Sequence, residues 1–213
     1  MVSNLHLDIL PKRQKLLFET FSKLGWISNF YLAGGTALAL QIGHRRSIDF
    51  DFFSEQEFDV RFVRKKLVAL GDYEVYADSE QIIDGALNSV RTSFFNLPYP
   101  LINLEVRSGN LRIASKEDIA AMKLSAISTR GSRKDFIDLF FLLTEFSFEE
   151  IVRFYEKKYG KNGENVYCVL KGLVYFVDAE QKPMPNLLID VAWREVKKRM
   201  VQEHKAYLGK LKA

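Results

Sequence analysis

Two aspartates stand two positions apart on a segment with alternating side chains, and they limit the possible folds more than any other part of this sequence. Residues 48–53 read Ile-Asp-Phe-Asp-Phe-Phe, a pattern that predicts a strand. Asp49 and Asp51 would share one face with Ser47 and Phe53, while Ile48, Phe50 and Phe52 anchor the other face in the core. Two carboxylates this close repel each other unless a cation lies between them, and Mg²⁺ prefers such oxygen ligands. Taken alone, the pair also fits an exposed acidic face of a sheet.

A glycine turn precedes the aspartates. The apolar run 30–32 predicts a short buried strand that ends at Gly34 and Gly35, and Thr36 can cap a short helix through Gln41. Glycines let backbone N–H groups approach a phosphate closely, and the N-terminus of a helix favours negative charge. Gly-Gly-Thr alone often serves only the geometry of a turn. Followed after one short helix by the paired aspartates, it predicts a site that binds phosphate.

Residues 44–47, His-Arg-Arg-Ser, lie between the turn and the aspartates. Arg45 and Arg46 can neutralise a triphosphate through bidentate hydrogen bonds, or they can pair with acidic residues at the surface. Ser47 shares the face of the two aspartates and joins the candidates for phosphate binding. His44 has no evident partner for metal binding in the sequence, so we expect it to be structural or exposed.

A second group of polar residues lies on two expected helices that follow Ser115. Gly131 interrupts the helical pattern and divides it in two. On the first helix, Lys123 shares a face with apolar residues, so its ammonium group requires an anion, either a phosphate or a carboxylate. On the second helix, Asp135 and Asp138 share a face. These aspartates can pair with Lys123 and neighbouring basic residues, or they can take part in function.

The remaining patterns predict an α+β fold, in which a mixed sheet with flanking helices precedes a helical C-terminal region. Strands are expected at residues 73–77, 81–87, 90–97 and 102–106, and helices at residues 11–24 and 58–70. From Ser115 the pattern is helical almost to the end. No linker rich in Pro, Gly or Ser separates the two parts. We therefore expect residues 1–114 to form an α/β core and residues 115–213 a helical region packed on it.

Composition narrows the class of protein. The 213 residues are 47% hydrophobic and 27% charged, which excludes long disorder. The single Cys168 excludes an internal disulfide and fits a reducing compartment. The N-terminus has no signal-peptide pattern, and the most apolar late segment, residues 166–177, is too short to span a membrane, so we expect a soluble cytoplasmic protein. The last twenty residues hold seven basic and two acidic side chains, which fits either contact with RNA or a solvated helix face.

Residues 32–53, LAGGTALALQIGHRRSIDFDFF, resemble the first two motifs of the AbiEii/AbiGii toxin family of nucleotidyltransferases, which belongs to the DNA polymerase β-like superfamily. Residues 118–126 and 130–139 resemble its third and fourth motifs, a helix lysine and a D-x-x-D segment. The resemblance implies a polymerase β-like nucleotidyltransferase core and transfer of NMP from an NTP, dependent on Mg²⁺ or Mn²⁺, to an RNA or protein acceptor. It also implies a bacterial toxin that often acts on RNA such as tRNA, with a cognate antitoxin as partner.

The resemblance assigns roles to the residues already singled out. The expected catalytic residues are Asp49, Asp51, Lys123, Asp135 and Asp138, of which the first two hold the metal ion. The residues expected to bind nucleotide or phosphate are Gly34, Gly35, Thr36, Arg45 and Ser47. Arg45 and Lys123 would offset the charge of the leaving pyrophosphate. Asp135 or Asp138 would orient Lys123 or contact the acceptor.

One departure from the superfamily pattern concerns a third carboxylate, which a neighbouring strand usually supplies. The strand expected at residues 90–97 offers Ser93 at that position, and Glu105 on the next expected strand is the alternative. Without such a carboxylate, the protein either uses another base or binds nucleotide without efficient transfer. Two further hypotheses therefore stay open: a non-catalytic nucleotide-binding module that acts through protein partners, and nucleotidyl transfer to a small molecule.

Overall fold

The structure, a computed structural model, describes residues 5–160 and 166–211. The chain forms two compact units. The sheet unit consists of Met1–Ile42, Arg46–Pro100 and Leu104–Ala114, and the helical unit consists of Gly43–Arg45, Leu101–Asn103 and Ser115–Ala213. His44 and Arg45 therefore belong to the helical unit, although they precede the paired aspartates in the sequence. No helix in the two described ranges has both the length and the apolar composition needed to cross a membrane.

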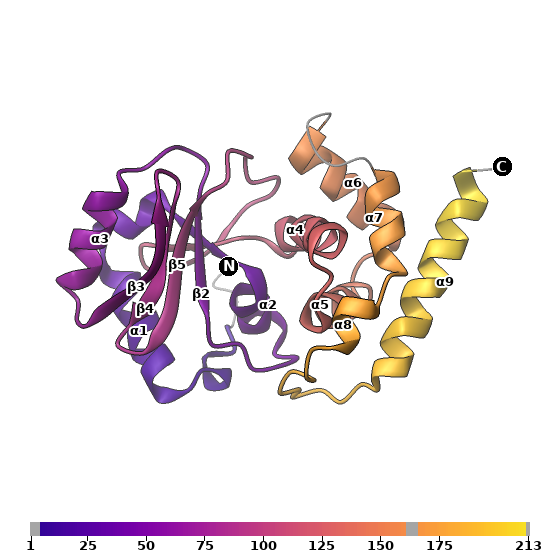
Figure 1. The fold of residues 1–213 in the computed structure, drawn as a ribbon, viewed down its shortest axis with the longest axis horizontal. Helices are drawn as coiled ribbons and strands as arrows, with labels where there is room; N and C mark the ends of the chain where they lie inside the picture. The colour runs from indigo at the N-terminus through magenta and orange to yellow at the C-terminus, as the bar shows by residue number, and fades with distance from the viewer. Residues whose placement is uncertain (1–4, 161–165, 212–213) are drawn as a thin grey trace. The chain divides into compact units, whose positions relative to one another are not determined.

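Within the described residues, the sheet unit is built on a mixed seven-stranded sheet with the order β3-β4-β5-β2-β1-β7-β6 (Figure 1). The strands are β1 Tyr31–Ala33, β2 Phe50–Ser54, β3 Tyr73–Ser79, β4 Ile82–Leu87, β5 Val90–Asn96, β6 Val106–Ser108 and β7 Leu111–Ile113. The helices of this unit are η1 Leu7–Ile9, α1 Lys12–Lys23, η2 Gly25–Asn29, α2 Gly34–Ile42 and α3 Val60–Val68. β2 is parallel to β5 and β1 is parallel to β7, whereas the other neighbours are antiparallel. The predicted α+β class and mixed sheet are confirmed.

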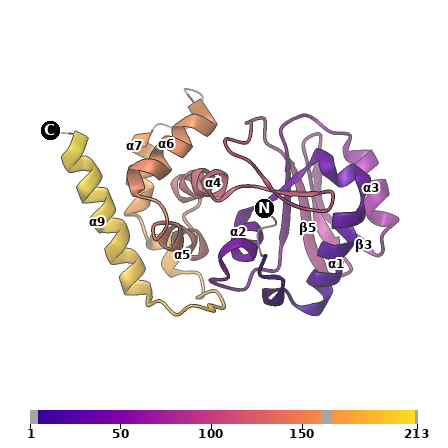
Figure 2. The ribbon, with the colours of Figure 1, turned by 180° about the vertical axis from the view of Figure 1, so that it is seen from behind.

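Alternation along β2 separates a buried face of the sheet from a polar face. Phe50 and Phe52 are fully buried, and both pack edge-on against Phe21 of α1, with ring centroids 5.9 and 5.0 Å apart. Phe52 also stacks on Phe94 of β5 at 4.7 Å. α1 and α3 lie on the same side of the sheet (Figure 1, Figure 2). Because side chains alternate along a strand, Asp51 projects from the face opposite the phenylalanines.

Two element boundaries near the paired aspartates differ from the sequence prediction. α2 begins at Gly34, so Thr36 lies within its first turn and does not cap the helix. β2 begins at Phe50, so Asp49 directly precedes the strand. Ile48 was expected in the core but is 50% exposed, because it lies in the loop before the paired part of β2.

The strand predicted at residues 102–106 is wrong. The backbone N–H groups of Ile102 and Asn103 donate to the carboxylate of Asp118 at 3.0 and 3.3 Å, so they bond a helix side chain instead of a neighbouring strand. Strand pairing begins later, where β6 and β7 form a hairpin. Gly109 in its turn has a φ of 59°, a left-handed conformation that favours glycine.

The helical unit is arranged around α4, which contacts α5, α6 and α7, while α9 packs along the same three helices (Figure 1). Its helices are α4 Lys116–Thr129, α5 Arg133–Leu142, α6 Phe148–Tyr159, α7 Val166–Leu173, α8 Val177–Glu180 and α9 Trp193–Leu211. Ser115 caps α4 by accepting a hydrogen bond from the N–H of Asp118 at 3.0 Å. Gly131, with a φ of 47°, separates α4 from α5. The predicted helical C-terminal region is confirmed.

A buried ion pair joins α4 to α6. Lys158 Nζ donates to Asp118 Oδ1 at 2.8 Å, and both side chains are 0% exposed. The hydroxyl of Ser115 donates to Asp118 Oδ2 at 2.8 Å. Together with the N–H groups of Ile102 and Asn103, these donors supply the hydrogen bonds that a charged carboxylate loses when it is removed from water.

Candidate active site

The two aspartates predicted to hold a metal ion lie next to the glycine turn. Asp51 pairs with Ala33 at the end of β1, directly before Gly34. Gly34 has a φ of 70°, and a Cβ at this position would lie 3.0 Å from Asp51 Oδ2. Glycine therefore accepts both the backbone conformation and the close approach of the carboxylate. Gly35 follows in the first turn of α2, and both aspartates are half-buried, so solvent reaches them.

Thr36 ties α2 to the loop before β2. Its hydroxyl donates to the carbonyl oxygen of Asp49 at 2.5 Å and lies 2.9 Å from Ser47 Oγ. Thr36 is only 1% exposed, so its hydroxyl is committed to these partners. The structure thus brings together the glycine turn, Thr36, Ser47 and the two aspartates. The hydrogen bond from Thr36 fixes the position of the Asp49 backbone.

Two residues that the sequence analysis did not select, Asp84 and Arg91, extend this polar face. Ser93 of β5 pairs with Asp51 on one side and with Asp84 of β4 on the other. Its hydroxyl donates to Asp84 Oδ1 at 2.6 Å, and Arg91 Nε and Nη2 donate to the same carboxylate at 3.2 and 2.7 Å. Burial raises the pKa of Asp84, but the hydrogen bonds from Arg91 and Ser93 outweigh this and hold it below the ordinary value.

Glu105, the other residue considered as a third carboxylate, directly precedes β6 at the far edge of the sheet. β1 and β7 lie between β2 and β6. With about 4.8 Å between neighbouring strands, Glu105 is roughly 14 Å from the position of Asp51. Its carboxylate instead binds Arg107 at 2.5 Å and Arg112 at 3.2 Å. The sheet order therefore excludes Glu105 as a ligand of a metal ion shared with Asp51.

Asp138 is the centre of a second polar cluster, which lies in the helical unit. Its Oδ1 faces His44 Nε2 at 2.8 Å and accepts from Arg45 Nε at 2.6 Å. Its Oδ2 accepts from Arg45 Nη2 at 2.8 Å and pairs with Lys123 Nζ at 2.5 Å. Burial raises the pKa of Asp138, but the positive charges of Lys123 and Arg45 lower it well below the ordinary value. Asp138 is fully buried, so its carboxylate is enclosed by these basic residues.

Asp135 holds Lys123 from a second side. Lys123 Nζ donates to Asp135 Oδ1 at 2.9 Å, and Arg130 and Ser132 bind the same carboxylate at 3.0 and 2.5 Å. Burial lowers the pKa of Lys123, but the negative charges of Asp138 and Asp135 outweigh this and raise it above the ordinary value. The lysine therefore stays charged, although its side chain is only 4% exposed. One network connects all four predicted residues of this region: Arg45, Lys123, Asp135 and Asp138.

His44 belongs to this network. It is fully buried, and its Nδ1 has no hydrogen-bond partner among the described residues. Burial lowers the pKa of His44 by more than the neighbouring Asp138 raises it. The neutral ring therefore carries its proton on Nε2 and donates it to Asp138. Of the two expectations for His44, structural or exposed, the structural one is confirmed.

The carboxylates of Asp49 and Asp51 suit a Mg²⁺ ion. Mg²⁺ is usually held by one or two carboxylates together with water and substrate phosphates. In the described part of the chain, no cluster of three or more His, Cys, Asp or Glu side chains could hold a metal by itself. The donor set therefore fits a metal ion that binds together with a nucleotide.

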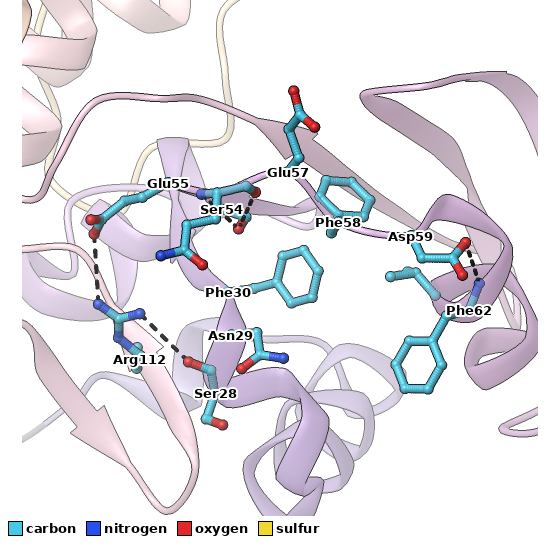
Figure 3. A pocket seen from close by; sticks show the side chains of 12 residues that line it. Ser28, Asn29, Phe30, Ser54, Glu55, Glu57, Phe58, Asp59, Phe62 and Arg112 are labelled. Carbon is cyan, nitrogen blue, oxygen red and sulfur yellow. Dashed lines mark hydrogen bonds and ion pairs between the residues drawn. The ribbon is translucent and has the colours of Figure 1, made fainter.

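A pocket of about 440 Å³ lies at the other end of β1 and β2 (Figure 3). Its lining includes Phe30, directly before β1, and Glu55, directly after β2, so the strands separate it from the paired aspartates. Glu57 and Asp59 add negative charge, and Arg112 lies 3.8 Å from Glu55. None of the predicted site residues lines this pocket, and its acidic lining disfavours a triphosphate.

The fold is that of nucleotidyltransferases. MenT4, nucleotidyltransferase toxin Rv2826c from Mycobacterium tuberculosis H37Rv, matches with a TM-score of 0.57 at 14% identity, over 90% of this chain and 84% of that chain. JHP933 from Helicobacter pylori matches with a TM-score of 0.52 at 19% identity, over 95% of each chain. The predicted nucleotidyltransferase core is confirmed.

Sequence comparison identifies the family. The family model described as nucleotidyl transferase AbiEii toxin, type IV TA system, matches residues 15–113 and 89–210. The chain is also 36% identical over 205 residues to the uncharacterized protein aq_aa25 of Aquifex aeolicus (strain VF5). This alignment covers 93% of this chain and 98% of that relative. The chain therefore belongs to the AbiEii family of nucleotidyltransferase toxins, and the predictions of family and enzyme class are confirmed.

Proposed function

We propose that this protein transfers a nucleoside monophosphate from an NTP to an acceptor in a reaction that depends on Mg²⁺ or Mn²⁺. The observation that carries the proposal is the approach of Asp51 to Gly34 at the first turn of α2. A helix N-terminus with glycines binds phosphate, and paired carboxylates bind a metal ion. A triphosphate held at this turn and a metal ion held by Asp49 and Asp51 would therefore lie in contact.

Each predicted site residue of the sheet unit has a proposed role. Asp49 and Asp51 would hold the metal ion, which when bound neutralises part of the charge of the triphosphate. The backbone of Gly34 and Gly35 would seat a phosphate. Thr36, with Ser47, keeps the loop of Asp49 aligned with α2. This fixes the distance between the residues that would bind the metal ion and those that would bind the phosphate.

The cluster of the helical unit supplies positive charge in this proposal. Lys123 would supply this charge as a buried cation and not as a ligand of the triphosphate. Asp135 and Asp138 would orient its ammonium group, and Arg45 would keep Asp138 charged while adding to the positive charge. The burial of both aspartates and their short contacts with Lys123 support this positioning role.

We further propose RNA, such as tRNA, as the acceptor class and an antitoxin as a protein partner, in the cytoplasm. The excess of basic residues among the last twenty, seven against two, supports a polyanionic partner. The family description as a toxin of a type IV TA system supports an antitoxin. In this proposal residues 1–114 form the nucleotidyltransferase core, and residues 115–213 form the helical region of the same enzyme.

The test combines labelled nucleotides with growth inhibition. Purified protein is incubated with each NTP labelled at the α-phosphate, Mg²⁺ and total cellular RNA, and label on RNA is measured. Asp49→Ala should abolish both this transfer and any growth inhibition on expression, whereas the exposed Asp190→Ala should preserve both. Unchanged toxicity or transfer in Asp49→Ala would overturn the assignment.

A second candidate, a nucleotide-binding module without catalysis, is favoured by one observation. The strand position expected to hold a third carboxylate is occupied by Ser93. This candidate predicts that an NTP with Mg²⁺ raises the melting temperature of the protein, while no label reaches RNA, protein or small-molecule fractions. Label on the small-molecule fraction alone would instead identify transfer to a small molecule.

A further inference from the structure

Arg91 stands beside the paired aspartates on the polar face of the sheet. Phe50 at the start of β2 pairs with Thr92 of β5, so Asp49, directly before β2, lies beside Arg91 of β5. Neighbouring strands are about 4.8 Å apart. Hydrogen bonds to Asp84 raise the pKa of Arg91, and the charges of Asp49 and Asp51 raise it further. The register therefore places Arg91 beside both aspartates, and their negative charges act on its guanidinium group.

The guanidinium group of Arg91 is held on one side and reaches solvent on the other. Its Nε and Nη2 bind the two oxygens of Asp84, and Asp84 is fixed in turn by the hydroxyl of Ser93. The side chain of Arg91 is 55% exposed, whereas that of Asp84 is only 17% exposed. An arginine carries five N–H donors, so donors remain for a ligand after Asp84 is bound.

Charge indicates which ligand those donors fit. A triphosphate beside Asp49 and Asp51 adds negative charge to a site that already holds two carboxylates, and one divalent ion offsets only part of it. Arg45 and Lys123 are buried and bound to carboxylates of their own cluster. Arg91, by contrast, lies on the face of the sheet that carries Asp51, and solvent reaches its side chain. A guanidinium group also matches the geometry of phosphate oxygens.

We infer, on the basis of the proposed nucleotidyl transfer, that Arg91 binds the triphosphate of the NTP, and that Asp84 and Ser93 position its guanidinium group. The contact is to phosphate oxygens, so it is independent of the base of the NTP. In this arrangement Ser93 and Asp84 do not replace a third metal carboxylate. They fix an arginine beside the two carboxylates that hold the metal ion.

The test separates binding of phosphate from turnover. Inorganic tripolyphosphate with Mg²⁺ is the probe, and its binding is measured by calorimetry together with kcat and KM for the preferred NTP. Arg91→Ala should weaken tripolyphosphate binding and raise KM by roughly tenfold, as expected for the loss of one charge-assisted hydrogen bond, with a smaller change in kcat. Arg91→Lys should restore part of the affinity. Asp84→Asn keeps Arg91 but weakens the hydrogen bonds that hold its guanidinium group. Its KM should lie between those of the wild type and of Arg91→Ala.

The control is Arg64→Ala. Arg64 of α3 is 52% exposed, close to the value for Arg91, and it pairs with Asp78 of β3 in the same unit at 3.3 Å. This variant should bind tripolyphosphate like the wild type, and circular dichroism establishes that each variant is folded. Arg91→Ala with unchanged tripolyphosphate affinity and KM would overturn the inference while leaving the proposed function intact. A wild-type protein that transfers no nucleotide would overturn the proposed function instead.

Discussion

Gly34 combines a left-handed backbone with a steric contact, and both exclude a side chain. In Gly34→Ala, the new Cβ would lie 3.0 Å from Asp51 Oδ2 at a φ of 70°. We expect the free energy of unfolding to fall by about 1 kcal/mol because of the backbone strain. We also expect transfer to fall about tenfold or more, because the carboxylate must move. Chemical denaturation and initial rates of NMP transfer measure the two effects.

Gly25→Ala is the matched control for this substitution. A Cβ at Gly25 would meet no atom within 4 Å, and its backbone is not left-handed. We expect both its stability and its activity to stay near the wild-type values. If Gly34→Ala were as active as Gly25→Ala, the close approach of Asp51 to α2 would have no part in the reaction.

His44 gives the stability of the protein a dependence on pH near neutrality. Because burial lowers its pKa, the unfolded chain takes up a proton as the pH falls below the ordinary value of 6.5, and the folded protein does not. Stability therefore decreases on acidification, by up to about 1.4 kcal/mol per pH unit for one proton. The depressed pKa values of Asp135 and Asp138 act separately, because their contribution is lost only as the pH falls below about 4.

Urea denaturation at about pH 7.5 and about pH 5.5 isolates the contribution of His44. His44→Gln keeps a side-chain N–H that can face Asp138 but removes the titrating ring, so we expect the decrease in stability between these values to shrink. His204→Gln, the same substitution in α9, serves as the control and should keep the decrease. An unchanged pH dependence in His44→Gln would show that a different group is responsible.

Local sequence patterns predicted some of the site residues and could not predict others. Asp49, Asp51 and the glycine turn were predicted because strand alternation and turn chemistry depend on adjacent residues. The partner of His44 is Asp138, which lies 94 positions away, so only the folded chain reveals why the histidine is buried. Asp84 could have been predicted, because the hairpin of β4 and β5 places it opposite Ser93.

At the scale of elements, the ion pair between α4 and α6 should be a major source of stability. Lys158→Met leaves Asp118 buried without its counter-ion, so we expect the free energy of unfolding to fall by about 3–5 kcal/mol. The adjacent Lys157 is exposed and donates to the carbonyl oxygen of Ile102 at 2.8 Å. We expect Lys157→Met to cost less than about 1 kcal/mol, as measured by the same denaturation experiment. Equal losses in the two variants would refute the special role of the buried pair.

The same carboxylate explains the strand that the sequence pattern misplaced. Residues 102–106 alternate like a strand, but Asp118 accepts the N–H groups of Ile102 and Asn103. A hydrogen bond to a side chain sixteen positions away cannot be read from local alternation. The helices, by contrast, were predicted close to their observed bounds because caps and breakers such as Ser115 and Gly131 act within a few residues.

At the scale of the whole molecule, the chain combines a sheet unit that carries the paired aspartates with a helical unit that carries the lysine network. The family was predictable because its motifs are short and lie at fixed positions in both units. The connection of Arg45 with Asp138 was not, because it joins the segment before the aspartates to a helix more than ninety positions later. In the mechanism that we propose, the paired aspartates of the sheet unit hold the metal ion.

The most direct test of that mechanism follows the two ends of the triphosphate. NTP labelled at the α-phosphate and NTP labelled at the γ-phosphate are incubated in parallel with the protein, Mg²⁺ and cellular RNA. We expect the α label on the acceptor and the γ label in pyrophosphate. With Asp51→Asn, or after removal of the metal by a chelator, we expect no α label on the acceptor and no γ label in pyrophosphate. Label from the γ-phosphate on the acceptor, or no α label on any acceptor, would contradict nucleotidyl transfer.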